Sequence, residues 1–473
     1  MNRRPFIGQC CAAVGSTGML SALAQLRATA AAAGSTSSPA TPATAGAVPS
    51  DYRALVCIFL NGGNDASNLI VPVGSGYAAY AAARSVLALP QSGLLPLAPK
   101  TSDGRTFGLH PSLREIHSLF GSGKAAVLAN VGTLVEPTTK AQYDARAVRL
   151  PPQLFSHNDQ SVQWQSSVPD RPFQTGWGGR TADLLNSLHS NNDVSMSVSL
   201  NGFNNFQVGD TVTQLAVNPA SNASPKGGPV AFSNTTGGNN PARYTAQKEL
   251  FAGANANLFA AAFGQLSRDA IGTSELLGTV LNTSPTLATA FPATTLGNQL
   301  KTIAYLISVS SALNLKRQVF FARVGGWDTH ADQVDEVDRA LGAHASLLQQ
   351  VSQAMNAFYQ ATVELGCADR VTAFTGSDFG RTYSSNGDGT DHGWGSHHLI
   401  VGGGVKGGDI YGRMPDLTIG GPDDTTQGRW IPTTSVDEYG ATLASWFGVS
   451  QSNLSLAFPN IGRFAKPNLG FLA

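Results

Sequence analysis

The stretch that decides the fold runs from Arg370 to Gly408 and reads RVTAFTGSDFGRTYSSNGDGTDHGWGSHHLIVGGGVKGG. It opens with an apolar run of strand-forming residues at 371–374, which a glycine soon interrupts. Asp378 and Arg381 come next, and a polar loop then leads into a second apolar run at 399–401. The pattern predicts two buried strands joined by a loop, with charged residues at the point where the first strand ends.

Carboxylates and imidazoles are concentrated in this loop, which contains Asp391, His392, His397 and His398. Three of the nine histidines of the chain lie within seven positions here. Aspartate oxygens and neutral histidine nitrogens are the usual ligands of zinc, manganese and iron. We therefore expect a metal site. The alternative that this stretch alone leaves open is a polar loop whose histidines cap backbone groups or lie in solvent.

Two other apolar runs end in the same way. The run at 52–60 is of the kind found in strands buried on both faces, and it ends in NGGND with Asp65. The run at 318–324 ends in GGWDTH, which contains Asp328 and His330. In an extended segment these last two side chains point to the same side, so one ion could take both. For each aspartate, capping of a turn or helix is the alternative.

The three aspartates predict an architecture. In a doubly wound parallel sheet all strands have their carboxyl ends at one edge, so Asp65, Asp328 and Asp378 should converge with His330 and the 391–398 segment. The fold class that we predict is α/β, with a doubly wound, mostly parallel sheet and helices on both faces.

Other segments complete this prediction. Further strands are expected at 125–131 and 194–200, and a loop and hairpin insertion at 201–243. Residues 244–315 have a mostly helical pattern that is interrupted near 283–295. A long helix is expected from about residue 331 to 366, with Asp335, Glu336 and Asp338 in its first turns.

Composition excludes some partners. The 473 residues include 30 Lys and Arg and 30 Asp and Glu, so the formal net charge is zero, and no basic stripe is present. Nucleic acid is therefore not expected as a partner. After the N-terminus no apolar run is long enough to span a bilayer.

The N-terminus resembles a bacterial Tat export signal. Arg3 and Arg4 precede a mildly apolar, Gly- and Ala-rich segment, and small residues offer cleavage sites near Ala32. We predict a signal at 1–32, a flexible linker at 33–50 and one domain at 51–473, located in the periplasm or outside the cell. An uncleaved amphipathic or anchoring helix is the alternative.

The cysteines do not suggest a metal site. Cys10 and Cys11 would leave with the signal, and Cys57 and Cys367 lie in or next to apolar strands. We expect two core thiols rather than a disulfide, and two thiolates cannot build a metal site.

Candidates for other catalytic roles are less specific. Ser156 beside His157 could be a nucleophile and its helper, whereas a helix N-cap at Ser156 or Asn158 is the alternative. Arg381 or Arg180 could clamp a tetrahedral anion, with surface ion pairs as the alternative. Ser435 and Asp437 are interpreted as caps of a helix at 438–447.

A family resemblance rests on several of these motifs. The chain is similar to the domain-of-unknown-function 1501 family of exported bacterial proteins, over nearly its whole length after the signal. That family in turn resembles the alkaline phosphatase/sulfatase superfamily. The motifs that carry the resemblance are NGGNDASNLIVP (61–72), GGWDTHADQ (325–333), SDFGRT (377–382), GTDHGWGSHHLIVGGGVKGG (389–408) and TSVDEYGATLASWFGV (434–449).

The resemblance implies an exported, metal-dependent hydrolase of phosphate or sulfate esters, acting on a small-molecule or polymer ester. It implies two divalent ions (Zn, Mn, Ca or Mg) and exported partners, with the Tat translocase during export. The implied ligands are Asp65, Asp328, His330, Asp378 and either His392 or His397. Ser156 is the residue nearest to the superfamily's nucleophile position.

The chain departs from the superfamily pattern in three respects. Asp328 and His330 are two positions apart, where four is usual, and Phe379 stands where SDHG would supply a histidine. Asp391–His392 or the His397–His398 pair would have to replace it. The chain has no C-x-P-S-R signature, so a formylglycine sulfatase is not expected. A non-catalytic exported protein that uses the fold to bind a partner or glycan is the alternative function.

Overall fold

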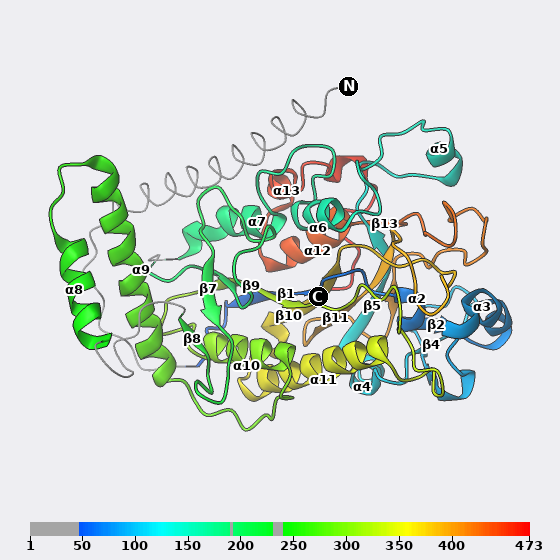
Figure 1. Ribbon diagram of the computed structural model, residues 1–473, viewed down its shortest axis with the longest axis horizontal. Helices are drawn as coiled ribbons and strands as arrows, with labels where there is room; N and C mark the ends of the chain where they lie inside the picture. Colours follow the sequence, from blue (N-terminus) through cyan, green and yellow to red (C-terminus); the bar gives the residue numbers. More distant parts are fainter. Residues whose placement is uncertain (1–46, 190–192, 230–239) are drawn as a thin grey trace.

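The computed structural model describes residues 47–189, 193–229 and 240–473 (Figure 1). The predicted export signal at 1–32 and most of the predicted linker at 33–50 lie outside the described residues. At the start of the described chain, Val48 is buried and its carbonyl accepts a hydrogen bond from Arg370 at 3.2 Å. The ordered domain therefore includes this residue.

One large sheet forms the centre of the molecule, with strand order β12-β5-β11-β10-β1-β9-β6-β7-β8 and β13 paired with β5. A smaller sheet has the order β2-β4-β3. The strands are β1 (Arg53–Leu60), β2 (Ile70–Pro72), β3 (Leu95–Pro96), β4 (Phe107–Leu109), β5 (Ala125–Gly132), β6 (Ser197–Ser199), β7 (Leu215–Asn218), β8 (Gly228–Pro229), β9 (Arg317–Val324), β10 (Val371–Ser377), β11 (Ser396–Gly402), β12 (Ile410–Tyr411) and β13 (Thr434–Ser435).

The register of three parallel strands positions the candidate site. β1 lies between β9 and β10, and Leu60 is level with Val324 on one side and with Ser377 on the other. All three strands therefore end at the same edge of the sheet and at the same position along the strand direction. β11 runs antiparallel to β10, so the loop between them returns to this edge.

Helices cover both faces of the sheet (Figure 1). In that view α4, α10 and α11 lie below it, with α6, α7, α12 and α13 above it. The helices are α2 (Ala66–Leu69), α3 (Tyr77–Arg84), α4 (Arg114–Gly121), α5 (Lys140–Asp144), α6 (His157–Ser166), α7 (Trp177–Leu185), α8 (Asn240–Ala252), α9 (Leu258–Asn282), α10 (Thr295–Ser308), α11 (Ala343–Glu364), α12 (Val436–Phe447) and α13 (Leu454–Ala457). The predicted fold class, a mostly parallel α/β sheet with helices on both faces, is confirmed.

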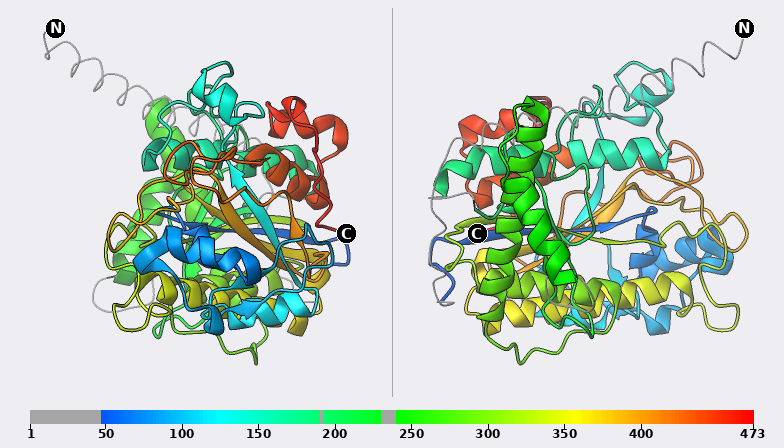
Figure 2. Two further views of the ribbon diagram at one scale, coloured as in Figure 1. Left: turned by 90° about the vertical axis from the view of Figure 1, so that its right-hand side faces the viewer. Right: turned by 60° about the vertical axis from the view of Figure 1, so that its left-hand side comes forward.

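The α8–α9 pair forms a helical hairpin at one end of the molecule, on the left of Figure 1 and in front on the right of Figure 2. Its first helix begins at Asn240, within the last residues of the predicted insertion at 201–243. In that insertion β7 and β8 pair antiparallel, and residues 230–239 lie outside the described ones. Across the described residues, no helix combines the length and the apolar character that crossing a bilayer requires.

The long helix predicted for 331–366 is wrong in its first part, because α11 begins only at Ala343. Residues 331–342 form a loop. The Asp335 carboxylate accepts backbone N–H bonds from Val337 and Asp338, and such local bonds compete with helix formation. Gly342 then adopts a φ of +111° before the helix starts. The acidic residues predicted for the first helical turns belong to this loop.

The predicted caps of α12 are confirmed in part. The Ser435 hydroxyl accepts a hydrogen bond from the Glu438 amide at 3.0 Å, and the Glu438 carboxylate accepts one from the Ser435 amide. This is a complete capping box. Cys57 and Cys367 are both buried free thiols, as expected.

Candidate metal centre

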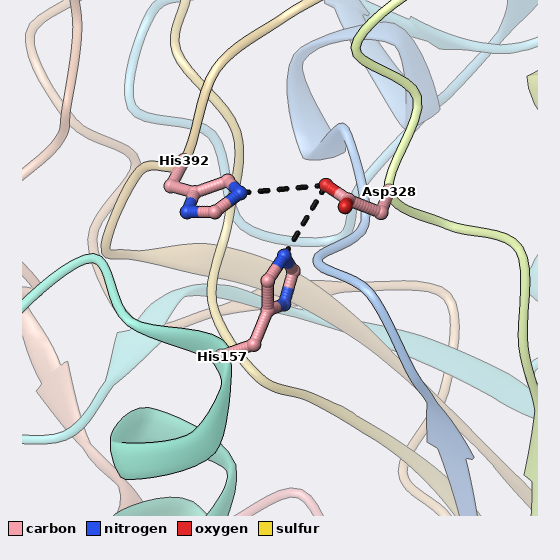
Figure 3. Close-up of side chains that lie close together, drawn as sticks. All are labelled: His157, Asp328 and His392. Carbon is pink, nitrogen blue, oxygen red and sulfur yellow. Dashed lines mark ion pairs between the residues drawn. The ribbon is translucent and has the colours of Figure 1, made fainter.

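Four side chains meet at the edge where β1, β9 and β10 end, and we call them the cluster: His157, Asp328, His330 and His392. Asp328 and His330 lie on the loop after β9, and His392 lies on the loop between β10 and β11. His157 is the first residue of α6. Figure 3 shows the rings of His157 and His392 directed at the carboxylate of Asp328.

The ligand atoms of the cluster are closely spaced. Asp328 Oδ1 lies 3.2 Å from Nε2 of His157, 3.1 Å from Nε2 of His330 and 3.4 Å from Nε2 of His392. The ligand atoms of His157, Asp328 and His392 all lie within 4.8 Å of one another. Atoms that bind zinc tetrahedrally at about 2.0–2.1 Å are separated by about 3.3–3.4 Å. The spacing therefore fits a metal ion.

Each imidazole is held by its other nitrogen. Nδ1 of His157 lies 2.8 Å from the Asp378 carboxylate, and Nδ1 of His392 lies 2.7 Å from the Phe155 carbonyl. Nδ1 of His330 lies 3.3 Å from the Asp391 carboxylate. Carboxylates and carbonyls only accept, so each Nδ1 donates and each ring presents its Nε2 to the Asp328 carboxylate. Metal-binding histidines are oriented in this way.

Two observations test whether these residues fit a cation. His157 Nε2 is buried and lies 3.2 Å from Asp328 Oδ1, the same oxygen that the other two Nε2 atoms approach. Nε2 of His330 and Nε2 of His392 are only 2.9 Å apart. Since both Nδ1 atoms donate elsewhere, two lone pairs face each other and repel unless a proton or a cation lies between them. A divalent cation satisfies all of these atoms together.

The electrostatics of the cluster favour its ligand forms. Burial raises the pKa of Asp328, but the hydrogen bond and the positive charge of Arg381 outweigh this, and the net pKa lies below its ordinary value. Burial lowers the pKa of His392. At neutral pH the carboxylate is therefore ionised and the His392 ring is neutral, as metal binding requires.

His157 leads to a prediction for the metal-free protein. Its hydrogen bond to Asp378 raises its pKa above the ordinary 6.5, although burial opposes the shift. Because the folded-state pKa is the higher one, the stabilisation is complete below the unfolded pKa and disappears as pH rises through the folded pKa. We expect Asp378→Asn to weaken this pH dependence, measured as urea midpoints on both sides of pH 6.5. An unchanged dependence in Asp378→Asn would contradict the assignment.

Aromatic and glycine residues shape the floor of the site. The Phe379 ring centroid lies 4.7 Å from that of His157 and 4.9 Å from that of His392, so it supports both imidazoles. At Gly62, where φ is +123°, an added Cβ would lie 2.5 Å from the Asp328 amide nitrogen. At Gly63 it would lie 2.5 Å from the Phe379 ring. Glycine at these two positions lets the strand exits approach each other.

The side-chain nitrogens of both predicted arginines donate hydrogen bonds within the protein. Arg381 is buried, and its nitrogens donate to Asp328, to the Gly62 carbonyl at 3.1 Å and to Thr390. Arg180 donates to the carbonyls of Ala457, Thr175 and Ser166. Arg381 therefore contacts the cluster through Asp328, whereas Arg180 supports the packing of α7.

The structure does not bring Asp65 into the cluster. This aspartate is fully buried, forms an ion pair with Arg84 and accepts a hydrogen bond from Gln333 at 2.6 Å. It also caps α2, because its carboxylate accepts from the Ser67 amide at 3.2 Å. Its oxygens are therefore satisfied by the protein.

His397 and His398 also lie apart from the cluster, because they belong to β11 rather than to the loop before it. Nδ1 of His397 accepts the Asn130 amide at 2.9 Å. Nδ1 of His398 lies 3.3 Å from the Thr375 hydroxyl, and its ring stacks on Tyr439. Burial lowers the pKa of His397 to about 4 and that of His398 to about 3, as expected for neutral core histidines.

Ser156 caps α6 in the structure. Its hydroxyl accepts from the Asp159 amide at 3.5 Å and donates to the Asp159 carboxylate at 2.6 Å. The residues on either side of it serve the cluster, since Phe155 holds His392 and His157 is a member. His157 as a ligand is the residue that the sequence reasoning missed. The available signal was its place after β5, which runs parallel to β10 and ends at the same edge.

Comparison with solved structures finds partial similarity to three that differ strongly in sequence. Ps i-CgsB in complex with k-i-k-neocarrahexaose has 10% identity and a TM-score of 0.34, covering 88% of this chain and 77% of that one. The PsFucS1 sulfatase from Pseudoalteromonas sp. has 9% identity and a TM-score of 0.35, covering 85% and 68%. The lipoteichoic acid synthase LtaP from Listeria monocytogenes has 8% identity and a TM-score of 0.32, covering 87% and 76%. Similarity at this level says nothing about activity.

Comparison of the sequence with protein-family models identifies the family, which the solved structures do not. No curated protein matches the sequence. The family model described as "Protein of unknown function (DUF1501)" matches residues 52–429, a range that contains every member of the cluster. The chain therefore belongs to the DUF1501 family.

Proposed function

We propose that this chain is an exported, metal-dependent hydrolase of phosphate or sulfate esters. The observation that carries the proposal is the cluster, in which three imidazole Nε2 atoms lie within 3.1–3.4 Å of one carboxylate oxygen. Three imidazoles and one carboxylate that converge on one point form a donor set that suits a transition-metal ion. The ester class and export are taken from the motifs of the sequence and not from this geometry.

The donor set favours zinc. Imidazole nitrogens with one carboxylate oxygen suit zinc, and also manganese or iron, better than calcium or magnesium, which prefer oxygen ligands. His157, Asp328 and His392 would hold the ion. His330 is either a fourth ligand or lies at the position that a substrate takes, because its side chain is 44% exposed. The open side of the site is at Asp328, whose side chain is 45% exposed.

The roles of the residues follow from their contacts. A bound divalent ion supplies Lewis-acid chemistry and lowers the pKa of water. Asp378, Asp391 and the Phe155 carbonyl orient the imidazoles through their Nδ1 atoms, so that each Nε2 faces the Asp328 carboxylate. Arg381 keeps Asp328 ionised and fixed. Phe379 closes the floor, so that a substrate approaches from the exposed side.

Metal analysis and an ester assay test the proposal. We expect purified protein to contain about one zinc or manganese ion per chain. Metal-free protein should gain hydrolysis of aryl phosphates or aryl sulfates when either ion is added back. Protein that binds no metal, and shows no hydrolysis with either ion, would contradict the proposal.

A second candidate function is a non-catalytic one, in which the chain binds another exported protein. The α8–α9 hairpin favours it, because Leu258 and Phe259 near its turn are 81% and 77% exposed. Exposed apolar patches of this kind often mark interaction sites. An Asp328→Ala, Asp378→Ala double variant that keeps the full biological function in cells would support this candidate over the hydrolase.

A further inference from the structure

We propose that Arg429 binds the anionic group of the substrate beside the metal centre, an inference that rests on the proposed function. A phosphate or sulfate ester brings negatively charged oxygens to the site, and these require donors near the metal ligands. The two arginines that the sequence suggested for this role have committed their nitrogens to the protein. Arg429 has not.

Arg429 contacts the backbone of His392. Its Nε donates to the His392 carbonyl at 2.7 Å, and its guanidinium carbon lies 5.1 Å from the centroid of the Phe155 ring. The Phe155 carbonyl in turn accepts from Nδ1 of His392. One residue therefore contacts both the ligand and the group that orients it. Stacking on Phe155 restricts the guanidinium plane, which reduces the entropy lost when it binds.

The terminal nitrogens of Arg429 are available. Among the described residues, neither Nη1 nor Nη2 has a hydrogen-bond partner, and the residue is only half-buried. Burial raises the pKa of the neighbouring Asp391 carboxylate, whereas hydrogen bonds from Asn386 at 3.0 Å and from His330, together with the charge of Arg429, lower it. Four N–H groups thus remain without a partner in the described part of the chain, on a guanidinium that contacts the His392 backbone and stacks on Phe155.

The chemistry of this group fits a tetrahedral oxyanion. A guanidinium edge donates two parallel hydrogen bonds to two oxygens of a phosphate or sulfate, which a lysine cannot do. A neutral ligand of the metal forms no such charge-assisted pair with the guanidinium, so its affinity does not depend on Arg429. Arg429 should therefore raise the affinity for anions selectively, without changing how accessible the metal is.

Direct binding measurements on the zinc-loaded full chain test this inference. In Arg429→Met we expect the Kd of inorganic phosphate to rise about 10- to 100-fold, as the loss of charge-assisted hydrogen bonds implies. The Kd of imidazole, a neutral metal ligand, serves as the reference for metal access. The ratio of the two Kd values should therefore change in Arg429→Met, change less in Arg429→Lys, and stay constant in the matched surface variant Arg171→Met.

Three outcomes would overturn the inference: no phosphate binding by the wild type, an equal phosphate Kd in Arg429→Met, or a parallel loss of imidazole and bound zinc. The last outcome would mean that Arg429 only holds His392 in position for the metal and does not bind the anion. Because the measurement needs no turnover, it separates the two proposals. Phosphate binding through Arg429 in a protein inactive on every ester keeps this inference and removes the hydrolase, whereas hydrolysis with an unchanged phosphate Kd does the reverse.

Discussion

His157→Ala is expected to remove the bound metal ion and to lower ester hydrolysis by at least about 100-fold, because loss of a residue that only orients a metal ligand already costs about 10- to 100-fold. The ring supplies a buried Nε2 that lies 3.2 Å from Asp328 Oδ1, within the cluster. Its removal leaves Asp328, His330 and His392 as the remaining candidate ligands. Metal content by mass spectrometry, together with initial rates after zinc addition, measures both effects.

The matched control is His117→Ala, which removes a histidine of α4 whose Nε2 lies 2.8 Å from the Pro96 carbonyl of β3 and which is no member of the cluster. This variant should keep its metal and its activity. Full metal occupancy in His157→Ala would show that the ion, if bound, is held elsewhere. Loss of metal in both variants would point to a general effect on folding, which circular dichroism would detect.

Asp65→Ala is expected to lower the free energy of unfolding by about 3–5 kcal/mol, because it leaves a buried cation without its partner. Both side chains of the Asp65–Arg84 pair are 0% exposed. The Arg84 guanidinium also donates to the carbonyls of Thr382 and Tyr383, so it cannot leave for solvent without disturbing the loop after β10. Urea unfolding of the metal-free protein measures the loss.

The same variant separates a structural aspartate from a metal ligand. Folded Asp65→Ala should keep its metal, since the carboxylate is paired with Arg84 and not with the cluster. The double variant Asp65→Ala, Arg84→Met should recover part of the stability, because it removes the unpaired charge. Loss of metal from folded Asp65→Ala would instead support the ligand role that the sequence resemblance implied.

The sequence was sufficient to predict the three strand exits. The apolar runs that became β1, β9 and β10 are nearly continuous, and each ends in glycine followed by aspartate. Such runs are buried on both faces, and the parallel arrangement then fixes a common edge. The positions of Asp328, His330 and Asp378 at that edge depend only on this pattern.

What the sequence could not predict depends on partners that lie far along the chain. Asp65 follows the same pattern as Asp328, but Arg84 neutralises it. His397 and His392 have the same chemistry, but the former lies within β11 and the latter precedes it. His157 reaches the cluster through the path of the long loop after β5, which local periodicity does not encode. The loop at 331–342 was missed because Asp335 satisfies backbone amides that a helix would have used.

The level exits of β1, β9 and β10 have a consequence for how the cofactor is acquired. The proposed ligands come from residues 157, 328 and 392, so the site assembles only after distant parts of the chain have paired. Under the proposed function, metal binding would therefore follow formation of the sheet rather than start it. A chain that folds before it crosses a membrane would receive its ion in the compartment of synthesis, from the pool of metal available there.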